Sequence, residues 1–434
     1  MSAQQQVQDC LDFIDASPSP WHVIAALEQR LHAFKFQRLD EKDDWCLTAG
    51  GRYYVVRDES SIIVFVAGRK NPAEHGFKIL GAHTDSPGLR LKPNPAIKSD
   101  NLLRLSVEVY GGPILATFSD RDLSLAGRIA YRTASGKIAS RLVRFEQPLL
   151  RLPNLAIHMN RAVNEDGLKL NKQTELPLIF ASATDQQLPS DQFTSLLTGA
   201  SGLEAQQILS WEFNIHDTQK GAFWGENQAF YANSQLDNLA SCHAGITALL
   251  NDAALQSGNT LVCAFFDHEE IGSESCKGAA GSFLPDVLER IALAQTIDKQ
   301  GYQRALANSL MISADMAHAY QPNFPNAYEA GHKLCVNQGP AIKINANHRY
   351  ASNCLSAAAF IDLCQQAEVP YQKYAHRGDL PCGSTIGPIA SAKLGMATVD
   401  VGNPMWAMHS VRESAGTLDH GYLIKVLNQF FAAM

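Results

Sequence analysis

The sequence lacks three features: an excess of positive charge, a long hydrophobic run and closely spaced cysteine pairs. A formal net charge of −7 argues against a surface that binds nucleic acid or an anionic membrane. No stretch approaches the ~18 consecutive apolar residues of a membrane-spanning helix. Nine scattered cysteines without CxxC spacing argue against a disulfide framework. We therefore expect no nucleic-acid partner, no membrane partner and a reducing, cytoplasmic location.

The amino-terminal segment also lacks the order of a secretory signal. Residues 1–10 are polar and glutamine-rich, with no basic segment followed by an apolar run, so we expect no signal peptide. The composition is that of an ordinary globular protein, because 46% of the 434 residues are apolar and 18% are charged. This length favours two domains, each with a core of its own.

Short apolar runs predict strands that are buried on both faces of a sheet. The runs are 52–57, 62–67, 77–82, 261–266, 310–314 and 396–401. Helical patterns alternate with them; the first predicted helix begins at Ser19-Pro20, where serine can cap the helix and proline suits its first turn. Two more are expected at 239–250 and 354–367. The alternation predicts an α/β fold with a mixed, mostly parallel sheet covered by helices.

The middle of the chain follows a different pattern. Apolar and polar residues alternate from Leu103 to Tyr110, and two strand-like runs flank Ser135-Gly136 as in a hairpin. Such alternation is typical of antiparallel sheet with one wet face. The polar segment 185–204 is expected to be a loop or a surface helix. We therefore predict a β-rich domain at 95–233, inserted into an α/β domain that comprises 1–94 and 234–434.

Acidic and histidine side chains follow several of the predicted buried strands or begin a helix: His83, Asp85, Asp237, Glu269, Glu270, Asp315 and His409. Each alone is weak evidence, since a lone histidine is usually structural and an acidic pair is usually solvated. Ligands of open α/β sheets, however, bind beyond the carboxyl ends of the strands. Carboxylates gathered there repel one another unless cations lie between them, which indicates a pair of divalent metal ions. Imidazole and carboxylate without thiolate suit zinc, with manganese or cobalt as substitutes.

The consecutive Glu269 and Glu270 can divide two tasks, one binding metal and the other serving as general base to a metal-activated water. Asp85 stands two residues after His83, where it can orient the imidazole. His268, beside the acidic pair, is interpreted as a bystander.

At this point the chain resembles the M18 metallopeptidases, and within them the bacterial aminopeptidases related to aspartyl aminopeptidase. The motifs are 81–87 (GAHTDSP), 236–239 (LDNL), 267–273 (DHEEIGS), 313–318 (SADMAH) and 407–410 (AMHS). Further stretches agree at 153–158 (PNLAIH), 339–345 (GPAIKIN) and 382–388 (CGSTIGP). The order and spacing of so many motifs make the resemblance specific, and it covers essentially the whole chain.

The resemblance implies two zinc ions per subunit, held by His83, Asp237, Glu270, Asp315 and His409. In such enzymes Asp237 bridges both ions, His83 and Asp315 complete one site, and Glu270 and His409 complete the other. Glu269 is the general base and Asp85 supports His83. The peptide bond between Asp237 and Asn238 is commonly cis.

Three substrate-binding residues are also implied by the resemblance: His158, His318 and Lys343. Lys343 would pair with an acidic side chain at the peptide's N-terminus. His158 would reach the active site of a neighbouring subunit, although descriptions of the family also count it as a zinc ligand. Family members form tetrahedral dodecamers through the inserted domain, so a homo-oligomer is expected. The implied function is hydrolysis of the N-terminal residue of peptides, with a preference for Asp or Glu.

Other functions remain open from the residues alone, because fold does not fix function. An aminopeptidase that prefers neutral residues such as leucine, a carboxypeptidase and a metal-dependent amide deacylase all fit the same two-metal site. A non-catalytic assembly or carrier protein and a metal-storage protein are the rivals from other classes. The intact Glu269 and five intact ligands argue against both.

Overall fold

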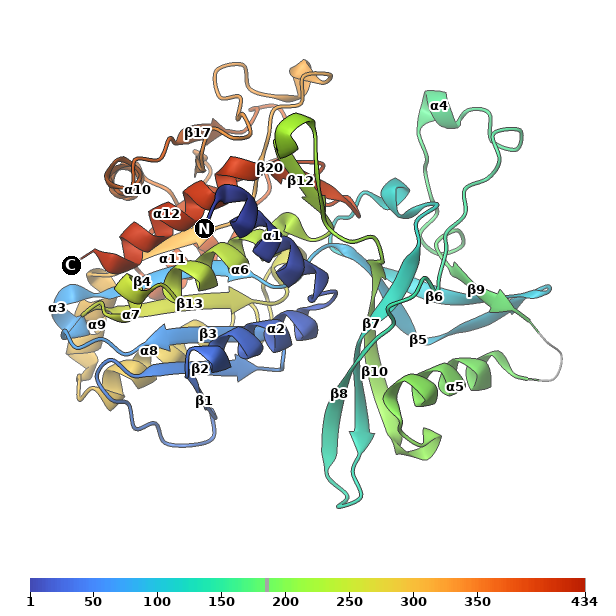
Figure 1. Cartoon of the computed structure of the whole chain (residues 1–434), viewed down its shortest axis with the longest axis horizontal. Coiled ribbons are helices and arrows are strands. Elements are labelled where there is room, and N and C mark those ends of the chain that lie inside the picture. The colour runs from blue at the N-terminus through green and yellow to red at the C-terminus, as the bar shows by residue number, and fades with distance from the viewer. Residues whose placement is uncertain (184–186, 434) are drawn as a thin grey trace.

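The computed structural model describes residues 1–183 and 187–433, which form two lobes (Figure 1). One lobe carries both chain termini and a large sheet between helices. The other lobe is built mainly of long antiparallel strands. The connections between the lobes run close to β12 (Phe230–Asn233) and β5 (Gly88–Ser99).

Nine described strands form the large sheet of the helical lobe. In spatial order they are β1 (Gln37–Leu39), β2 (Arg52–Arg57), β3 (Ser61–Val66), β13 (Thr260–Phe266), β4 (Phe77–His83), β14 (Leu310–Ala314), β18 (Ala397–Gly402), β16 (Ala341–Ile344) and β17 (Gln372–Ala375). The central strands β13, β4, β14 and β18 are mutually parallel, whereas β3 and β16 pair antiparallel with their inner neighbours. The prediction of a mixed, mostly parallel sheet is confirmed.

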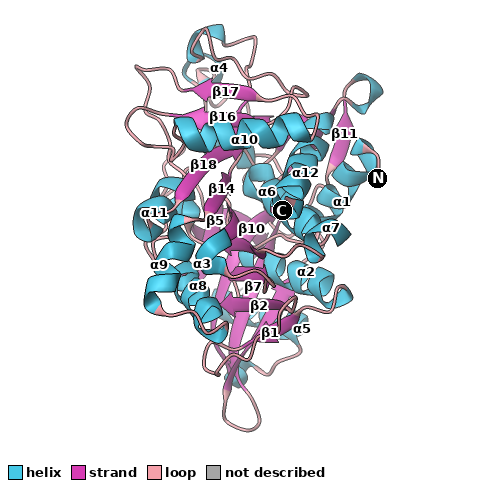
Figure 2. Cartoon of the chain, turned by 90° about the vertical axis from the view of Figure 1, so that its left-hand side faces the viewer, coloured by secondary structure: helices cyan, strands magenta, loops and turns pink. Residues whose placement is uncertain are grey.

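Both faces of this sheet are covered, which explains why its strands are continuously apolar. In β3, Ile62 and Val64 pack into one hydrophobic cluster, whereas Ile63 and Phe65 pack into another on the opposite face. The first cluster is covered by α1 (Ala3–Asp15), α2 (Pro20–Ala33), α6 (Leu236–Leu249), α7 (Asp252–Leu255), α10 (Cys354–Gln366) and α12 (Thr417–Ala432). The second is covered by α8 (Phe283–Ala294), α9 (Lys299–Ala307) and α11 (Ile386–Leu394), with α3 (Pro72–His75) beside α9. Figure 2 shows helices on both sides of the strands.

The second sheet is antiparallel throughout its described pairs. Its strands, in spatial order, are β8 (Ile138–Arg144), β7 (Leu123–Arg132), β10 (Ile208–Asp217), β5 (Gly88–Ser99), β6 (Leu102–Tyr110) and β9 (Leu178–Ser182). Leu105 and Val107 of β6 pack into its core and Leu103 is buried as well, as the alternation predicts. The helix α5 (Pro189–Ser201) covers this core with Phe193 and Leu197. The expected surface helix is therefore partly buried, and the first residues of that segment lie outside the described ones.

The extent of the second sheet differs from the expected insert of 95–233. The sheet begins at Gly88, whereas β11 (Ala222–Trp224) and β12 (Phe230–Asn233) belong to a third sheet. There they join β20 (Glu413–Gly416), β19 (Pro404–Trp406) and β15 (Ala317–His318), which come from the C-terminal half of the chain. The sequence pattern does not tell which sheet a strand joins, because a β-strand has the same alternation in each. The division into domains stays a prediction.

The helix α1 precedes the first helix that the sequence predicts, and the polar composition of the N-terminus does not reveal it. Ser2 and Gln5 form a capping box, and Val7 and Leu11 are buried against the helical lobe. The first predicted helix is α2, which does begin at Pro20, but the Ser19 hydroxyl bonds the ring of His22 instead of capping the backbone.

Partly buried polar contacts fasten α1 in place. Asp9 pairs with Arg30 of α2 and accepts a hydrogen bond from His243 of α6, whose other ring nitrogen lies 2.9 Å from His420 of α12. The Asp9 carboxylate therefore ties three helices together, and its pKa lies well below the usual range because of His243 and Arg30.

All nine cysteines fall in the described part of the chain and all are free thiols, with Cys263 and Cys364 buried. Among the described residues, no helix is both long and apolar enough to cross a membrane.

Candidate metal centre

A single cavity of about 120 Å³ lies at the carboxyl edge of the large sheet. Three adjacent strands point their carboxyl ends toward it: β13, β4 and β14. The cavity is lined by six of the seven residues that the strand ends indicate: His83, Asp237, Glu269, Glu270, Asp315 and His409. The seventh, Asp85, lies directly behind them. Residues that are more than 300 positions apart in the sequence thus meet at one site.

The first half of the site is centred on His83, the last residue of β4. Its Nε2 atom lies 3.4 Å from Asp237 Oδ1, 3.6 Å from Asp315 Oδ1 and 3.9 Å from Glu269 Oε2. These distances are long for hydrogen bonds. Two ligand atoms that each lie ~2.1 Å from one tetrahedral zinc ion are roughly 3.4 Å apart, so the first two spacings suit a shared cation.

The second half of the site lies on the other side of Asp237. His409 Nε2 is 3.5 Å from Asp237 Oδ2 and 3.4 Å from Glu270 Oε2. His409 lies in the turn after β19 and has a positive φ of 68°. Asp237 therefore offers one carboxylate oxygen to each half, an arrangement that suits a bridging ligand.

Excess negative charge marks the whole centre. Burial alone lowers the pKa of both histidines, yet the carboxylates of Asp237 and Asp315 raise the pKa of His83 well above its usual value. Asp237 and Glu270 raise the pKa of His409 to about 11 in the same way. Burial also raises the pKa of Glu270 to about 7. In the absence of a cation, protons are drawn in to offset the carboxylates, so the charge of this donor set fits divalent metal ions.

An orphaned atom supports the same fit. Asp237 Oδ1 is buried without a hydrogen-bond partner among the described residues. A buried polar atom is costly unless something satisfies it. One ligand atom each from His83, Asp237 and Glu270 lies within 4.8 Å of the others. The Asp237–Asn238 peptide bond is cis, as the resemblance implies.

Asp85 contacts the segments that carry His83, Glu269 and Glu270. Its backbone carbonyl lies 3.0 Å from His83 Nδ1, which leaves Nε2 of the ring free to face the cavity. Its carboxylate accepts hydrogen bonds from the backbone N–H groups of Glu269 and Glu270, both at 3.1 Å. Asp85 thus ties the end of β4 to the turn after β13.

A buried glutamate that the sequence does not single out performs the matching task on the other half. Glu413 accepts a hydrogen bond from the backbone N–H of His409 at 2.6 Å and from that of Asp237 at 3.0 Å. Burial and the nearby Asp237 carboxylate raise the pKa of Glu413 well above its usual value. In the sequence, a lone glutamate four residues after a histidine does not indicate that it accepts these backbone hydrogen bonds.

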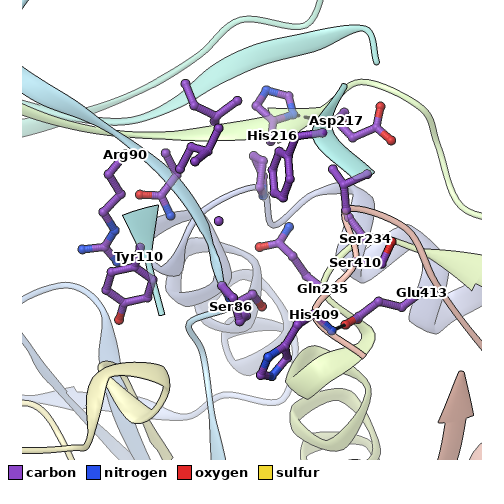
Figure 3. A pocket seen from close by; sticks show the side chains of 18 residues that line it. Ser86, Arg90, Tyr110, His216, Asp217, Ser234, Gln235, His409, Ser410 and Glu413 are labelled. Carbon is purple, nitrogen blue, oxygen red and sulfur yellow. Dashed lines mark hydrogen bonds between the residues drawn. The ribbon is translucent and has the colours of Figure 1, made fainter. Parts of the chain in front are cut away.

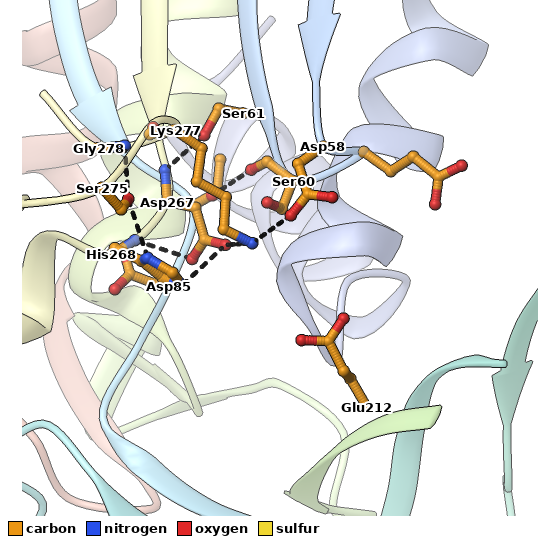
Figure 4. A network of polar contacts seen from close by, with 12 residues as sticks. Asp58, Ser60, Ser61, Asp85, Glu212, Asp267, His268, Ser275, Lys277 and Gly278 are labelled. Carbon is orange, nitrogen blue, oxygen red and sulfur yellow. Dashed lines mark hydrogen bonds and ion pairs between the residues drawn. The ribbon is translucent and has the colours of Figure 1, made fainter. Parts of the chain in front are cut away.

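A polar network secures the turn that carries Glu269 (Figure 4). Lys277 Nζ lies 2.7 Å from Asp58 and 3.1 Å from Asp267, at the end of β13. The ring of His268 turns away from the cavity and bonds Ser275. His268 lines no part of the cavity, which agrees with its interpretation as a bystander.

Two of the three expected substrate-binding residues line the cavity, and the third does not. Lys343 of β16 is 3% exposed, and its Nζ lies in the cavity 3.4 Å from Asp315 Oδ2. His318 of β15 also lines the cavity, and burial lowers its pKa to about 4, with Lys343 contributing. His158 lies on an exposed turn and lines no described pocket of its own chain.

Fold and site together define a metal-dependent enzyme of mixed α/β architecture, with a carboxylate and histidine centre at the carboxyl edge of its sheet. The model of the aminopeptidase I zinc metalloprotease family (M18) matches residues 13–431, and the chain belongs to this family. It is accordingly an M18-type metallo-aminopeptidase, a hydrolase that acts on N-terminal residues.

Relatives and solved structures agree along the whole chain. A probable M18 family aminopeptidase 2 of Pseudomonas paraeruginosa is 49% identical over 431 residues, which covers 98% of each chain. A chain in the cryo-EM structure of the Ape4 and Nbr1 complex is 36% identical, with a TM-score of 0.95, covering 99% of this chain and 86% of that one. Yeast aminopeptidase 1 is 26% identical with a TM-score of 0.87, covering 99% and 97%.

Proposed function

We propose that this aminopeptidase binds two zinc ions and removes acidic residues from the N-termini of peptides. The observation that carries the two-metal assignment is the position of Asp237, whose two carboxylate oxygens face His83 on one side and His409 on the other. Asp315 would complete the first site and Glu270 the second. Manganese or cobalt can substitute for zinc in such a donor set.

We assign Glu269 the role of general base, because it is the cavity carboxylate to which we assign no role as a metal ligand. Bound zinc supplies Lewis acidity and lowers the pKa of a water molecule at the centre. Glu269 takes the proton of that water during its attack on the scissile carbonyl and returns it to the departing amine. Asp85 keeps the Glu269 backbone in place through the N–H hydrogen bond. Burial and the neighbouring carboxylates raise the pKa of Glu269, so it is a strong proton acceptor.

The acidic preference rests on Lys343, a buried cation in the cavity wall. The cavity also contains Tyr350, whose ring centroid lies 5.5 Å from Lys343 Nζ. A buried ammonium is a strong partner for a substrate carboxylate, because the low dielectric of the cavity strengthens the ion pair. His318, held neutral by burial, would contact the same substrate end.

Lys343→Ala is expected to lower kcat/KM for Asp- and Glu-terminated substrates by ~10- to 100-fold and for Leu-terminated substrates by less than ~3-fold. The reason is that removal of a buried ion-pair partner costs a few kcal/mol only where the substrate carries the opposite charge. Initial rates on the three chromogenic substrates measure this. Since Lys343 also contacts Asp315, zinc content is checked in parallel. Equal losses on all three substrates would leave a zinc-site role for Lys343 and no acidic pocket.

The exopeptidase assignment is tested by comparing aminoacyl anilides with N-blocked peptides and with acylated amino acids. We expect cleavage only where the α-amino group is free. Cleavage of the blocked peptides would indicate a carboxypeptidase, and cleavage of the acylated amino acids would indicate a deacylase.

Oligomerisation is part of the proposal. One similar structure, 27% identical with a TM-score of 0.85, is the S. cerevisiae mApe1 dodecamer. We infer a homo-oligomer, expected to be a tetrahedral dodecamer, assembled through the β-rich domain. In it, the exposed His158 would reach the active site of a neighbouring copy and contact substrate. A cytoplasmic location remains our expectation.

A further inference from the structure

We propose that the segment from Tyr110 to Gly112 of the β-rich lobe positions the metal ligands of its own chain, with Tyr110 as the principal positioning residue. This inference rests on the proposed two-metal centre. It assigns the β-rich lobe a role within each subunit, besides any role between subunits. The segment follows β6, the strand of the second sheet that ends at Tyr110.

Tyr110 contacts the scaffold of the first half-site. Its hydroxyl donates a 2.6 Å hydrogen bond to Asp85 Oδ2, the same oxygen that accepts the backbone N–H of Glu270. The other oxygen accepts the backbone N–H of Glu269. Asp85 is fully buried, and the partners of its carboxylate among the described residues are these three donors and the ring of His83. Removal of the hydroxyl would leave a buried carboxylate oxygen with one donor fewer and would loosen the turn that carries both glutamates.

The next two residues contact the second half-site. The backbone carbonyl of Gly112 lies 3.1 Å from His409 Nδ1, so it can accept that N–H and direct Nε2 into the cavity. Gly111 has a φ of 66°, and a Cβ atom built on it would stand 3.2 Å from Cβ of Glu270. The chain can pass this close to Glu270 because the residue is glycine. The backbone N–H of Ile114 also donates to the carbonyl of His409, at 2.9 Å.

Arg90 fixes the Tyr110 ring. Its guanidinium carbon lies 3.6 Å from the ring centroid, and Figure 3 shows the guanidinium beside the ring and the Tyr110 hydroxyl directed away from it. Arg90 comes from β5, the strand paired with β6, so the ring is clamped within the second sheet. Two guanidinium nitrogens of Arg90 have no hydrogen-bond partner among the described residues, which leaves the aromatic face as its main contact.

Beside this segment, the two lobes face each other across a small cavity. A cavity of about 40 Å³ separates Arg90 and His216 of the second sheet from Gln235, His409 and Glu413 of the helical lobe (Figure 3). The lobes also meet close to His409 through Val411, which packs into the hydrophobic core of the second sheet and whose backbone N–H donates to Thr117 Oγ1 at 2.9 Å. The Tyr110–Gly112 segment is a part of this junction that contacts Asp85 and the ring of His409 directly.

Tyr110→Phe tests the proposal because it removes only the hydroxyl. Partners that orient metal ligands typically change metal affinity or activity by 10- to 100-fold when they are lost. We expect the zinc dissociation constant to rise or kcat to fall by ~10- to 100-fold, with KM within ~2-fold of the wild type. Equilibrium dialysis against a zinc buffer gives the first quantity, and steady-state rates of the zinc-loaded protein give the others.

Tyr131→Phe is the matched control, because Tyr131 lies in the same sheet under Arg141 at 5.1 Å and contacts none of the site residues named above. We expect it to equal the wild type. Arg90→Lys keeps the charge and loses planar stacking, so it should change the same quantities as Tyr110→Phe by a smaller factor. If Tyr110→Phe does not fold, Arg90→Lys serves as the test of the positioning role in its place.

Wild-type zinc affinity and kcat in the variants would overturn the proposal, and so would a change in KM alone. Zinc affinity is measured without any peptide. If the wild type cleaves no substrate with a free amino group, the proposed function fails. The zinc dissociation constants of the wild type and of Tyr110→Phe still test the positioning role of Tyr110 in that case.

Discussion

Glu269→Gln is expected to lower kcat by about 10³-fold while the protein keeps its zinc. The amide has nearly the shape of the carboxylate but cannot accept the proton of the attacking water, and general bases typically contribute 10²- to 10⁴-fold. Glu269 Oε2 is the most distant of the three carboxylate oxygens around His83 Nε2, at 3.9 Å, so its loss should leave the ligand set intact. Steady-state rates and metal analysis of the same preparation measure both effects.

Glu274→Gln is the matched control for this variant. Glu274 is an exposed carboxylate in the same loop and lines no part of the cavity. We expect wild-type rates from it. Near-normal turnover of Glu269→Gln would remove Glu269 from the role of base, and loss of zinc would make it a ligand.

Asp237→Asn is expected to remove most of the stabilisation of the fold by zinc. The amide presents one oxygen without charge, so it cannot bridge the two half-sites. At a zinc concentration 100 times the dissociation constant, a bound ion stabilises the native state by about 2.7 kcal/mol. A variant with ~100-fold weaker binding would gain about 0.4 kcal/mol under the same conditions. Thermal unfolding with and without zinc measures the difference, and turnover should fall with it.

Asp419→Asn serves as the control for a buried carboxylate elsewhere. Asp419 accepts backbone N–H groups of Asn337 and Gly339 and lines no part of the site cavity. Its substitution should lower the unfolding temperature while leaving the increase caused by zinc unchanged. If Asp237→Asn kept the wild-type increase, the bridging assignment would be wrong.

The sequence predicts the strands of the large sheet well because both of their faces are buried. The run 261–266, for example, contains no polar residue, and all of it lies within β13. The same property makes the site visible, since a carboxylate or histidine directly after such a run must lie at the carboxyl edge. His83, Glu269, Glu270 and Asp315 were found in this way, and all of them line the cavity.

The residues behind the ligands could not be predicted, because their roles depend on contacts between distant segments. Tyr110 ends an alternating strand and reads as an ordinary aromatic residue, yet its partner is Asp85. Glu413 acts through backbone N–H groups at 237 and 409, which sequence patterns do not report. The helix α1 was missed for another reason. Its apolar residues are diluted by glutamine, so its stability comes from packing against α6 and α12.

The central claim is that cleavage of free-amino substrates depends on metal at the Asp237 centre. The most direct test measures initial rates on Asp-, Glu- and Leu-terminated chromogenic substrates before chelation, after chelation and after addition of Zn²⁺, Mn²⁺ or Co²⁺. We predict cleavage that chelation abolishes and metal restores, fastest on the acidic substrates. Cleavage that survives complete removal of metal would contradict the account.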